Sequence, residues 1–393
     1  ANNHSRSNWQ KVKFGDVVRQ VKDKVDPETT GLERYIAGEH MDTDDLRIRR
    51  WGEINDDYLG PAFHMRFKPG QVLYGSRRTY LRKVAVPHFE GICANTTYVL
   101  EPKDPTVLLP ELLPFIMQTE RFHEHSIKQS KGSVNPYINF SDIAWYEFAL
   151  PPLEEQRRIV EIMQAIEIQH EAYEKCISST QKLITSTSAT ITYMSDLDEK
   201  NLSKLKLPER WSIKRIGELC NLGGGYGFRP KDWSDNGLPI IRIQNLNGSQ
   251  DFNYYDEEPQ EEWLVEPGEL LFAWAGMPGV SFGPCLWPGP TGVLNQHIYR
   301  VTPVNGISTV WLYHVLKLLT PWIERRAHGF KKSLLHIKKI ELTERLVPVP
   351  PPTIQQEIAT TLNHLEKSAT DLHQRYSLSA SLKTRLLNEV FRV

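Results

Sequence analysis

A proline-rich junction occurs twice in the chain. It reads Leu150-Pro151-Pro152-Leu153-Glu154-Glu155-Gln156-Arg157-Arg158-Ile159 in the first half and Val349-Pro350-Pro351-Pro352-Thr353-Ile354-Gln355-Gln356-Glu357-Ile358 in the second. Proline suits the first turn of a helix because its ring presets φ and its missing N–H would be unpaired there. We therefore expect a long helix after each junction.

The junctions belong to an internal duplication. Residues 9–18 match residues 211–220, residues 35–41 match 240–246, and residues 68–74 match 266–272. The second pair of segments predicts strands, and the third predicts a Pro-Gly turn that leads into an apolar strand. A repeat at a nearly constant offset of about 200 residues indicates two copies of one module.

The duplication predicts a mixed α+β (α/β) fold with four parts. Residues 1–150 form a first module, residues 151–200 a long helix and linker, residues 201–350 a second module, and residues 351–393 a second long helix. The two modules are separated by the helices, which pair with each other as a coiled coil if their apolar faces match.

Both helical segments carry apolar residues at alternating spacings of four and three, which is a heptad seam. The seam contains Ile159, Met163, Ile166, Tyr173, Ile177 and Ile184 in the first segment and Ile358, Leu362, Leu365, Leu372 and Tyr376 in the second. Two interpretations stay open: each helix packs on its own module, or the two helices pair and act as a spacer. His170, within the seam, is expected to be a packed polar residue.

Composition excludes several classes of protein. The chain has 393 residues, of which 40% are hydrophobic and 24% charged, and its formal net charge is −1. It is therefore neither disordered nor a polycation that coats nucleic acid. With no apolar run of membrane-spanning length and no apolar signal core, we expect a soluble intracellular protein. The four scattered cysteines predict core thiols, without a disulfide framework or a zinc site.

Two basic stretches contain no carboxylate. They span residues 58–89 and 325–340. Such stretches suit phosphate contacts, although a local basic run is as often a solvated face.

Catalytic motifs are missing from the sequence. It has no P-loop, no Gly-x-Ser-x-Gly elbow, no His-Glu-x-x-His and no dinucleotide-binding glycine motif. Residues 223–227, rich in glycine, predict a loop near DNA or a turn, and residues 123–125 predict a surface helix terminus rather than a metal site. Asn135-Pro136-Tyr137 lacks the second proline of a methyltransferase motif. We expect no enzyme, no cofactor and no metal.

At these motifs the chain resembles the specificity subunit of type I restriction–modification systems. The resemblance rests on the Trp-x-x-x-x-aromatic/apolar-Gly-acid opening of each module, the Pro-Gly strand, the Pro-Pro junction, and residues 132–143 before the first junction. Residues 329–340 occupy the corresponding place in the second copy, with Lys332 and Lys338 where polar residues are common.

The resemblance implies a non-catalytic DNA reader. Two target-recognition domains each bind one half of a split, asymmetric site in double-stranded DNA, and the two helices form an antiparallel coiled coil that sets the spacing. Two methyltransferase subunits dock around the coil, with restriction subunits as optional further partners, in the cytoplasm of a prokaryote. Adenine methylation and cleavage belong to those partners.

The side chains that contact DNA are expected among residues able to bind bases or phosphates. The candidates are Arg47, Arg49, Arg77, Arg78, Arg82, Lys131 and Asn135 in the first module and Arg229, Arg242, Gln244, Asn245, Arg326, Lys331 and Lys332 in the second. For each, the alternative is a surface charge or a structural polar residue. Two rival functions stay open: the reader of a related system with nuclease and methylase fused in another chain, and a coiled-coil scaffold or inhibitor that binds methyltransferase subunits without reading DNA.

Overall fold

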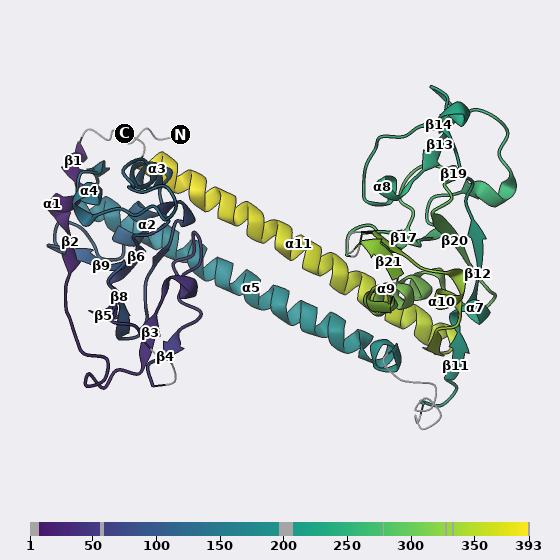
Figure 1. Ribbon diagram of the computed structural model, residues 1–393, viewed down its shortest axis with the longest axis horizontal. Coiled ribbons are helices and arrows are strands. Elements are labelled where there is room, and N and C mark those ends of the chain that lie inside the picture. The colour runs from purple at the N-terminus through teal and green to yellow at the C-terminus, as the bar shows by residue number, and fades with distance from the viewer. Residues whose placement is uncertain are drawn as a thin grey trace. The chain divides into compact units, whose positions relative to one another are not determined.

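The computed structural model describes residues 8–55, 59–195, 207–277, 279–326, 328–331 and 334–391. The chain divides into two compact units (Figure 1). Unit 1 contains Ala1–Lys175 and His373–Val393, and unit 2 contains Cys176–Leu372. Each unit therefore holds one module and part of both long helices, and the part boundaries expected at residues 150, 200 and 350 stay a prediction.

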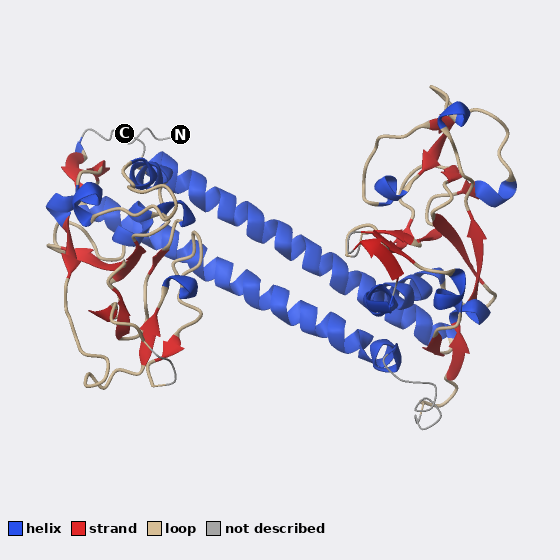
Figure 2. Ribbon diagram, in the orientation of Figure 1, coloured by secondary structure: helices blue, strands red, loops and turns tan. Residues whose placement is uncertain are grey.

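The module of unit 1 mixes short helices with two four-stranded sheets (Figure 2). Its strands are β1 (Gln10–Lys13), β2 (Val18–Val21), β3 (Arg34–Ile36), β4 (Gly52–Glu53), β5 (Phe63–Phe67), β6 (Val72–Gly75), β7 (Val84–Ala85), β8 (Gly91–Ala94), β9 (Thr97–Pro102) and β10 (Glu147–Leu150). Its helices are α1 (Phe14–Val17), η2 (Gly38–His40), η3 (Thr79–Leu81), α2 (Leu113–Met117), α3 (Glu120–Lys128) and α4 (Phe140–Ala144).

The module of unit 2 has the same kinds of element. Its strands are β11 (Ser212–Arg215), β12 (Cys220–Gly224), β13 (Leu238–Ile241), β14 (Tyr254–Tyr255), β15 (Leu264–Val265), β16 (Leu270–Ala273), β17 (Ala275–Gly276), β18 (Gly283–Leu286), β19 (Gly292–Leu294), β20 (Ile298–Pro303), β21 (His328–Lys331), β22 (Leu334–His336) and β23 (Leu346–Val349). Its helices are α7 (Ile216–Leu219), η4 (Pro230–Asp232), α8 (Ile243–Leu246), η5 (Glu261–Trp263), α9 (Thr309–Arg326) and α10 (Lys339–Thr343).

The order of strands confirms the duplication. The sheets of unit 1 run β2-β9-β6-β7 and β4-β3-β8-β5, and those of unit 2 run β12-β20-β16-β18 and β14-β13-β19-β15. In each second sheet one central pair is parallel, β3 with β8 and β13 with β19. In each module the first strand also pairs antiparallel with the strand before the proline junction. The two modules are copies of one mixed α+β topology.

The strands expected in the repeated segments are partly confirmed. The Pro-Gly turns before β6 and β16 place Gly70 at φ 82° and Gly268 at φ 86°, a left-handed conformation that glycine adopts without strain. The expectation of strands over residues 35–41 and 240–246 is wrong in its second half, because β3 and β13 end early and a helical turn follows.

The expectation of a loop or turn at residues 223–227 is wrong for the first two residues and holds for residues 225–227, which lie outside the strands. Gly223 and Gly224 lie in β12 and pair with β20. A Cβ on Gly225 would lie 2.3 Å from the carbonyl oxygen of Asn295, so the glycine allows two backbones to approach closely. Gly225 therefore serves close backbone packing just beyond the end of β12.

The two long helices confirm the heptad seam. They are α5 (Leu153–Ser195) and α11 (Pro352–Val390), with 43 and 39 residues. All eleven predicted seam residues are buried or half-buried, which fits an inward-facing stripe. In the described part of the chain, no helix combines the length and apolar character needed to cross a membrane.

Within unit 1 the helices run antiparallel. The His170 ring bonds the hydroxyl of Ser379 at 3.1 Å, the Tyr376 hydroxyl lies 3.1 Å from a Glu174 carboxylate oxygen, and Lys383 bonds Glu167. Residue numbers thus rise along α5 as they fall along α11. His170 is buried and packs on the Tyr376 ring, as expected for a packed polar residue.

Each helix also packs on a module, so the first interpretation is confirmed along with the pairing of the helices in unit 1, and the spacer role stays a prediction. The core of unit 1 includes Met163 of α5 together with Leu387 and Phe391. The core of unit 2 includes Ala359 of α11. Both helices therefore contribute to the hydrophobic core of unit 1, and α11 contributes to that of unit 2.

A buried glutamine joins each helix to its module. The Gln156 side chain accepts a hydrogen bond from the backbone N–H of Leu109 at 2.9 Å and donates to the carbonyls of Val107 and Pro151 at 2.8 and 2.9 Å. Gln355 accepts from the N–H of Ser308 at 2.9 Å and donates to Gly306 and Pro350. Both side chains are 1% exposed. The amide thereby satisfies three backbone groups at the point where each helix begins.

The cysteines follow the expectation of core thiols with one exception. Cys93 and Cys220 are buried and Cys285 is half-buried, but Cys176 is exposed. Cys176 lies on the outward face of α5, between seam positions, so the expectation is wrong for this residue.

Gln156→Ala tests the junction. Removal of the amide leaves three backbone groups without their partner, of which those of Leu109 and Pro151 belong to half-buried and buried residues, at a cost of about 1–3 kcal/mol for each buried unsatisfied group. We expect a clearly lowered melting temperature by calorimetry. Gln164→Ala, at an exposed position of the same helix, is the matched control, and equal melting temperatures for the two variants would contradict the role of Gln156.

Candidate nucleic-acid interface

An exposed corner of unit 1 gathers four of the predicted residues. It is formed by residues 76–82, which follow β6, and by a hairpin at residues 131–137. The backbone N–H of Arg78 donates to the Pro136 carbonyl at 2.6 Å, and the N–H of Ile138 donates to the Ser76 carbonyl at 2.9 Å. We call this surface the hairpin corner.

The backbone of the corner is held in an unusual conformation. Arg78 and Arg82 have φ values of 51° and 49°, in the left-handed region that bulky residues rarely adopt. The hydrogen bond between Thr79 and Ser130 hydroxyls, at 2.7 Å, fastens the loop to the end of α3. Such conformations persist only where surrounding contacts hold them.

The predicted side chains at the corner differ in what they contact. Arg78 Nε donates to the Asn135 carboxamide oxygen at 2.9 Å, and Lys131 pairs with Asp142 at 2.8 Å. The Asp142 carboxylate raises the pKa of Lys131, so this ammonium stays charged. Arg77 is exposed, and its guanidinium has no hydrogen-bond or ion-pair partner within the described part of the chain.

Exposed apolar side chains accompany these charges. Tyr80 is 52% exposed, Tyr137 41% and Val134, at the tip of the hairpin, 92%. Cations interleaved with aromatic rings are typical of surfaces that contact nucleic acid, because the rings pack on bases or sugars while the charges meet phosphates.

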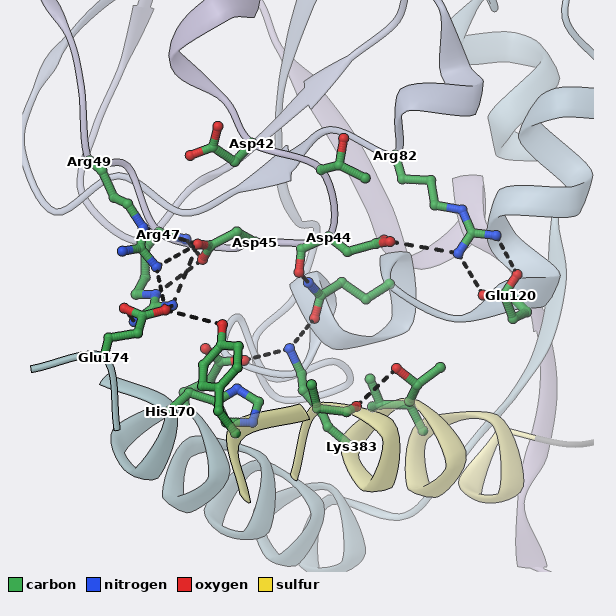
Figure 3. Close-up of a pocket in the computed structure, with 17 residues that line it drawn as sticks. Asp42, Asp44, Asp45, Arg47, Arg49, Arg82, Glu120, His170, Glu174 and Lys383 are labelled. Carbon is green, nitrogen blue, oxygen red and sulfur yellow. Dashed lines mark hydrogen bonds and ion pairs between the residues drawn. The ribbon is translucent and has the colours of Figure 1, made fainter. Parts of the chain in front are cut away.

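The side chains of Arg47, Arg49 and Arg82 line a polar pocket between the module and the long helices (Figure 3), with Arg82 extending there from the end of the hairpin corner. Arg47 and Arg49 each bond the Glu174 carboxylate of α5 at 2.8 Å, and both also pair with Asp45. These two arginines therefore tie the loop after η2 to a long helix.

The electrostatics of this contact favour full ionisation. Burial alone would raise the pKa of Glu174, but hydrogen bonds from Arg49 and Arg47 outweigh it and lower the pKa to about 2. The same carboxylates raise the pKa of Arg49. The pairs are intact at any physiological pH.

Arg82 is also held by carboxylates. It makes two bonds of 2.6 Å to Glu120 and lies 3.7 Å from Asp44. Of the seven residues predicted in the first module, the structure thus brings Arg77, Arg78, Lys131 and Asn135 together at the hairpin corner, and it engages the other three in ion pairs.

In unit 2, four predicted residues lie between η4 and the end of α8. Arg229 is exposed, and Arg242 lies over the Trp233 ring, with its guanidinium carbon 4.6 Å from the ring centroid. Gln244 is exposed and donates to the Asp251 carbonyl at 3.3 Å. Asn245 is 3% exposed and is occupied by backbone groups, so it supports the loop rather than facing solvent.

The remaining candidates of unit 2 lie near a second hairpin. Arg326 ends α9, and Lys331 ends β21 and pairs with Leu334 in β22. Lys332 lies outside the described residues. Since β22 also pairs with β17, this hairpin corresponds in topology to the bridges of Tyr137 with Arg77 and Lys131 in unit 1.

The histidines at residues 123–125 do not form a surface cluster. His123 is buried within α3, and burial lowers its pKa to about 4, so the expectation of a surface helix terminus is wrong for it. Among the described residues, no group of three or more histidine, cysteine, aspartate or glutamate side chains could hold a metal ion.

Three side chains with structural roles were given no role from the sequence. Gln156 and Gln355 are a shared position of the junction motif, and their equal positions in the two junctions were a signal for such a role. Trp233 has no such signal, since its contact with Arg242 joins residues nine positions apart across a loop.

The comparison with protein families matches both halves of the chain. The model of the type I restriction modification DNA specificity domain matches residues 6–179 and 208–380. The chain is 20% identical over 288 residues to the type I restriction enzyme MjaVIII specificity subunit of Methanocaldococcus jannaschii, covering 67% of this chain and 63% of that protein. It is 25% identical over 174 residues to the EcoBI specificity subunit of Escherichia coli, covering 43% of this chain and 35% of that protein.

The matched regions span less than two thirds of the length of these relatives. Solved structures resemble the whole chain. The S subunit of a type I restriction-modification system from M. genitalium has a TM-score of 0.63 at 17% identity, covering 100% of this chain and 98% of that one. A chain from a study of assembly and conformational transition of the type I R-M system has a TM-score of 0.55 at 20% identity, covering 98% and 97%. The fold is therefore shared, and because the family model matches most of both halves, the chain belongs to the type I restriction-modification DNA specificity domain family.

Proposed function

We propose that this chain is the DNA-specificity subunit of a type I restriction–modification complex. Each module binds one half of a split, asymmetric DNA site, and α5 with α11 sets the distance between the halves. Two methyltransferase subunits dock around the helices, with restriction subunits as optional partners. The chain itself is not an enzyme, and it works in the cytoplasm of a prokaryote.

The observation that carries this proposal is the repetition of one scaffold with different loops. The four-stranded sheets and the junctions of the two modules share one strand order, whereas the side chains outside them differ. Two copies of one scaffold, mounted on shared helices and carrying different contacting residues, suit two different half-sites on one DNA molecule. The relatives are named specificity subunits, which agrees with this assignment.

Within unit 1 we propose the hairpin corner as the DNA-facing surface. Arg77 is free to contact a base or phosphate, and Arg78 and Asn135 support each other beside it. We assign Arg47, Arg49 and Arg82 to the attachment of the module to the helices, because releasing them for DNA would leave Glu174 and Glu120 unpaired.

The function is tested by mapping adenine methylation across the genome. Cells that carry this chain with its methyltransferase subunit should show a split, asymmetric methylated motif, and cells lacking only this chain should lose it. Methylation that stays unchanged would contradict a DNA-reading role and favour the scaffold or inhibitor.

Arg77→Ala tests whether each module recognises its own half-site. Because Arg77 has no partner in the described part of the chain, its loss should leave stability unchanged and weaken recognition of one half-site only. Losing one base contact costs about 1–3 kcal/mol and losing a phosphate contact less. The readout is the methylated motif, and equal relaxation at both half-sites would contradict the modular assignment.

A matched insertion tests the spacer. Seven residues added after Ile177 in α5 and seven after Leu372 in α11 keep the heptad phase and lengthen the helix pair by about 10 Å. We expect the gap between half-sites to grow by up to about three base pairs, at 3.4 Å each. Replacing seven residues at the same points, without adding any, is the control, and an unaltered gap after insertion would exclude the spacer role.

A further inference from the structure

The guanidinium of Arg242 lies over an aromatic ring. Its guanidinium carbon lies 4.6 Å from the centroid of Trp233, and this ring is itself 40% exposed. Arginine stacks on indole through cation–π attraction, which fixes the plane of the guanidinium while leaving its edge available. The side chain is thus oriented at the protein surface.

The backbone beneath Arg242 is equally fixed. Its N–H donates to the carboxamide oxygen of Asn245 at 2.9 Å, and its carbonyl accepts from the N–H of Asn245 at 2.9 Å. The Asn245 amide nitrogen donates to the carbonyls of Ser249 and Asp251, both at 3.0 Å. A buried side chain therefore locks the turn from which Arg242 extends.

The nitrogen atoms of Arg242 are not used within the protein. Nε is buried and has no acceptor, and the two terminal nitrogens are neither buried nor bonded, as far as the described residues extend. Arg300, in contrast, places two nitrogens on Glu269. A stacked guanidinium with two free terminal nitrogens matches a ligand that offers two acceptors in one plane.

We infer that Arg242, positioned by Trp233, reads a guanine in the half-site bound by the module of unit 2. The O6 and N7 atoms of guanine are two coplanar acceptors at the major-groove edge, and arginine binds both at once. This inference rests on the proposed function and names a specificity-determining residue within it.

Comparison of the two modules shows that only the module of unit 2 has an arginine at this position. Ala37 occupies the position of Arg242 in unit 1, since its N–H donates to the His40 ring nitrogen at 3.0 Å just as Arg242 donates to Asn245. The turn is the same and the guanidinium is missing. A change at Arg242 must therefore alter one half-site and leave the other unchanged.

The test compares methylated motifs of cells that carry the full chain with its methyltransferase subunit. Arg242→Lys keeps the charge but removes the planar fork, and Arg242→Ala removes both. In each we expect the preference for guanine at one position of one half-site to fall about 5- to 100-fold. The other positions and the second half-site should keep their bases.

Trp233 is tested as a positioning residue. Trp233→Ala should relax the same single position, and Trp233→Phe should restore much of the preference because it keeps an aromatic face. Lys231→Ala is the matched control: it removes an exposed charge from the same loop without touching the stack, and its motif should equal that of the unchanged chain. Gel filtration and thermal melting of each complex verify assembly.

Four outcomes would overturn the inference. An unchanged motif in Arg242→Ala would exclude base reading, and equal weakening at every site would indicate a phosphate contact. A motif relaxed by Lys231→Ala to the same degree would assign the effect to charge alone. If the unchanged chain directs no split motif at all, the proposed function falls and this inference with it.

Discussion

The attachment of each module to a long helix depends on one buried amide. Gln156 and Gln355 each accept one backbone N–H and donate to two carbonyls, one of them at the proline junction itself. The prolines cannot donate hydrogen bonds there, so the backbone of this bend needs a side chain to satisfy it. With the bend fixed, the apolar face of each helix is directed into a module, and the seam that remains is directed to the other helix. The two-sided packing of α5 and α11 follows from this geometry.

Much of the architecture could be predicted because it repeats. The sequence predicts the duplication and the two long helices, because the junctions recur with the same spacing. It also predicts the stripe of apolar residues, because the stripe follows the periodicity of the α-helix. Contacts between residues on either side of a loop were harder to predict from the sequence. The glycines at 223–227 suggested a loop, but a close approach of two backbone segments, visible only in three dimensions, explains Gly225. Similarly, the strand predicted over residues 240–246 ended early because the side chain of Asn245 captures the backbone of Arg242.

A pattern of charges in the sequence does not show which arginines are paired with carboxylates in the folded protein. A sequence lists cations without their partners, so Arg47 and Arg77 are indistinguishable at that level. In the structure, Arg47 is paired with Asp45 and Glu174, residues that lie 2 and 127 positions away, whereas Arg77 and Arg242 keep free nitrogens. Carboxylate-bound arginines are costly to withdraw from their partners, and the unbound ones are available to an external ligand. The proposed division between attachment and reading rests on this difference.

The packing of α11 also sets an order of events during synthesis. Leu387 and Phe391 are buried in the core of unit 1, beside Met163. Ribosomes add about 5–20 residues per second, so more than 200 residues separate these core partners by roughly 10–40 s. During that interval the nascent module exposes the apolar surface that α11 later covers. The first module to be made is therefore completed only after the second has been translated.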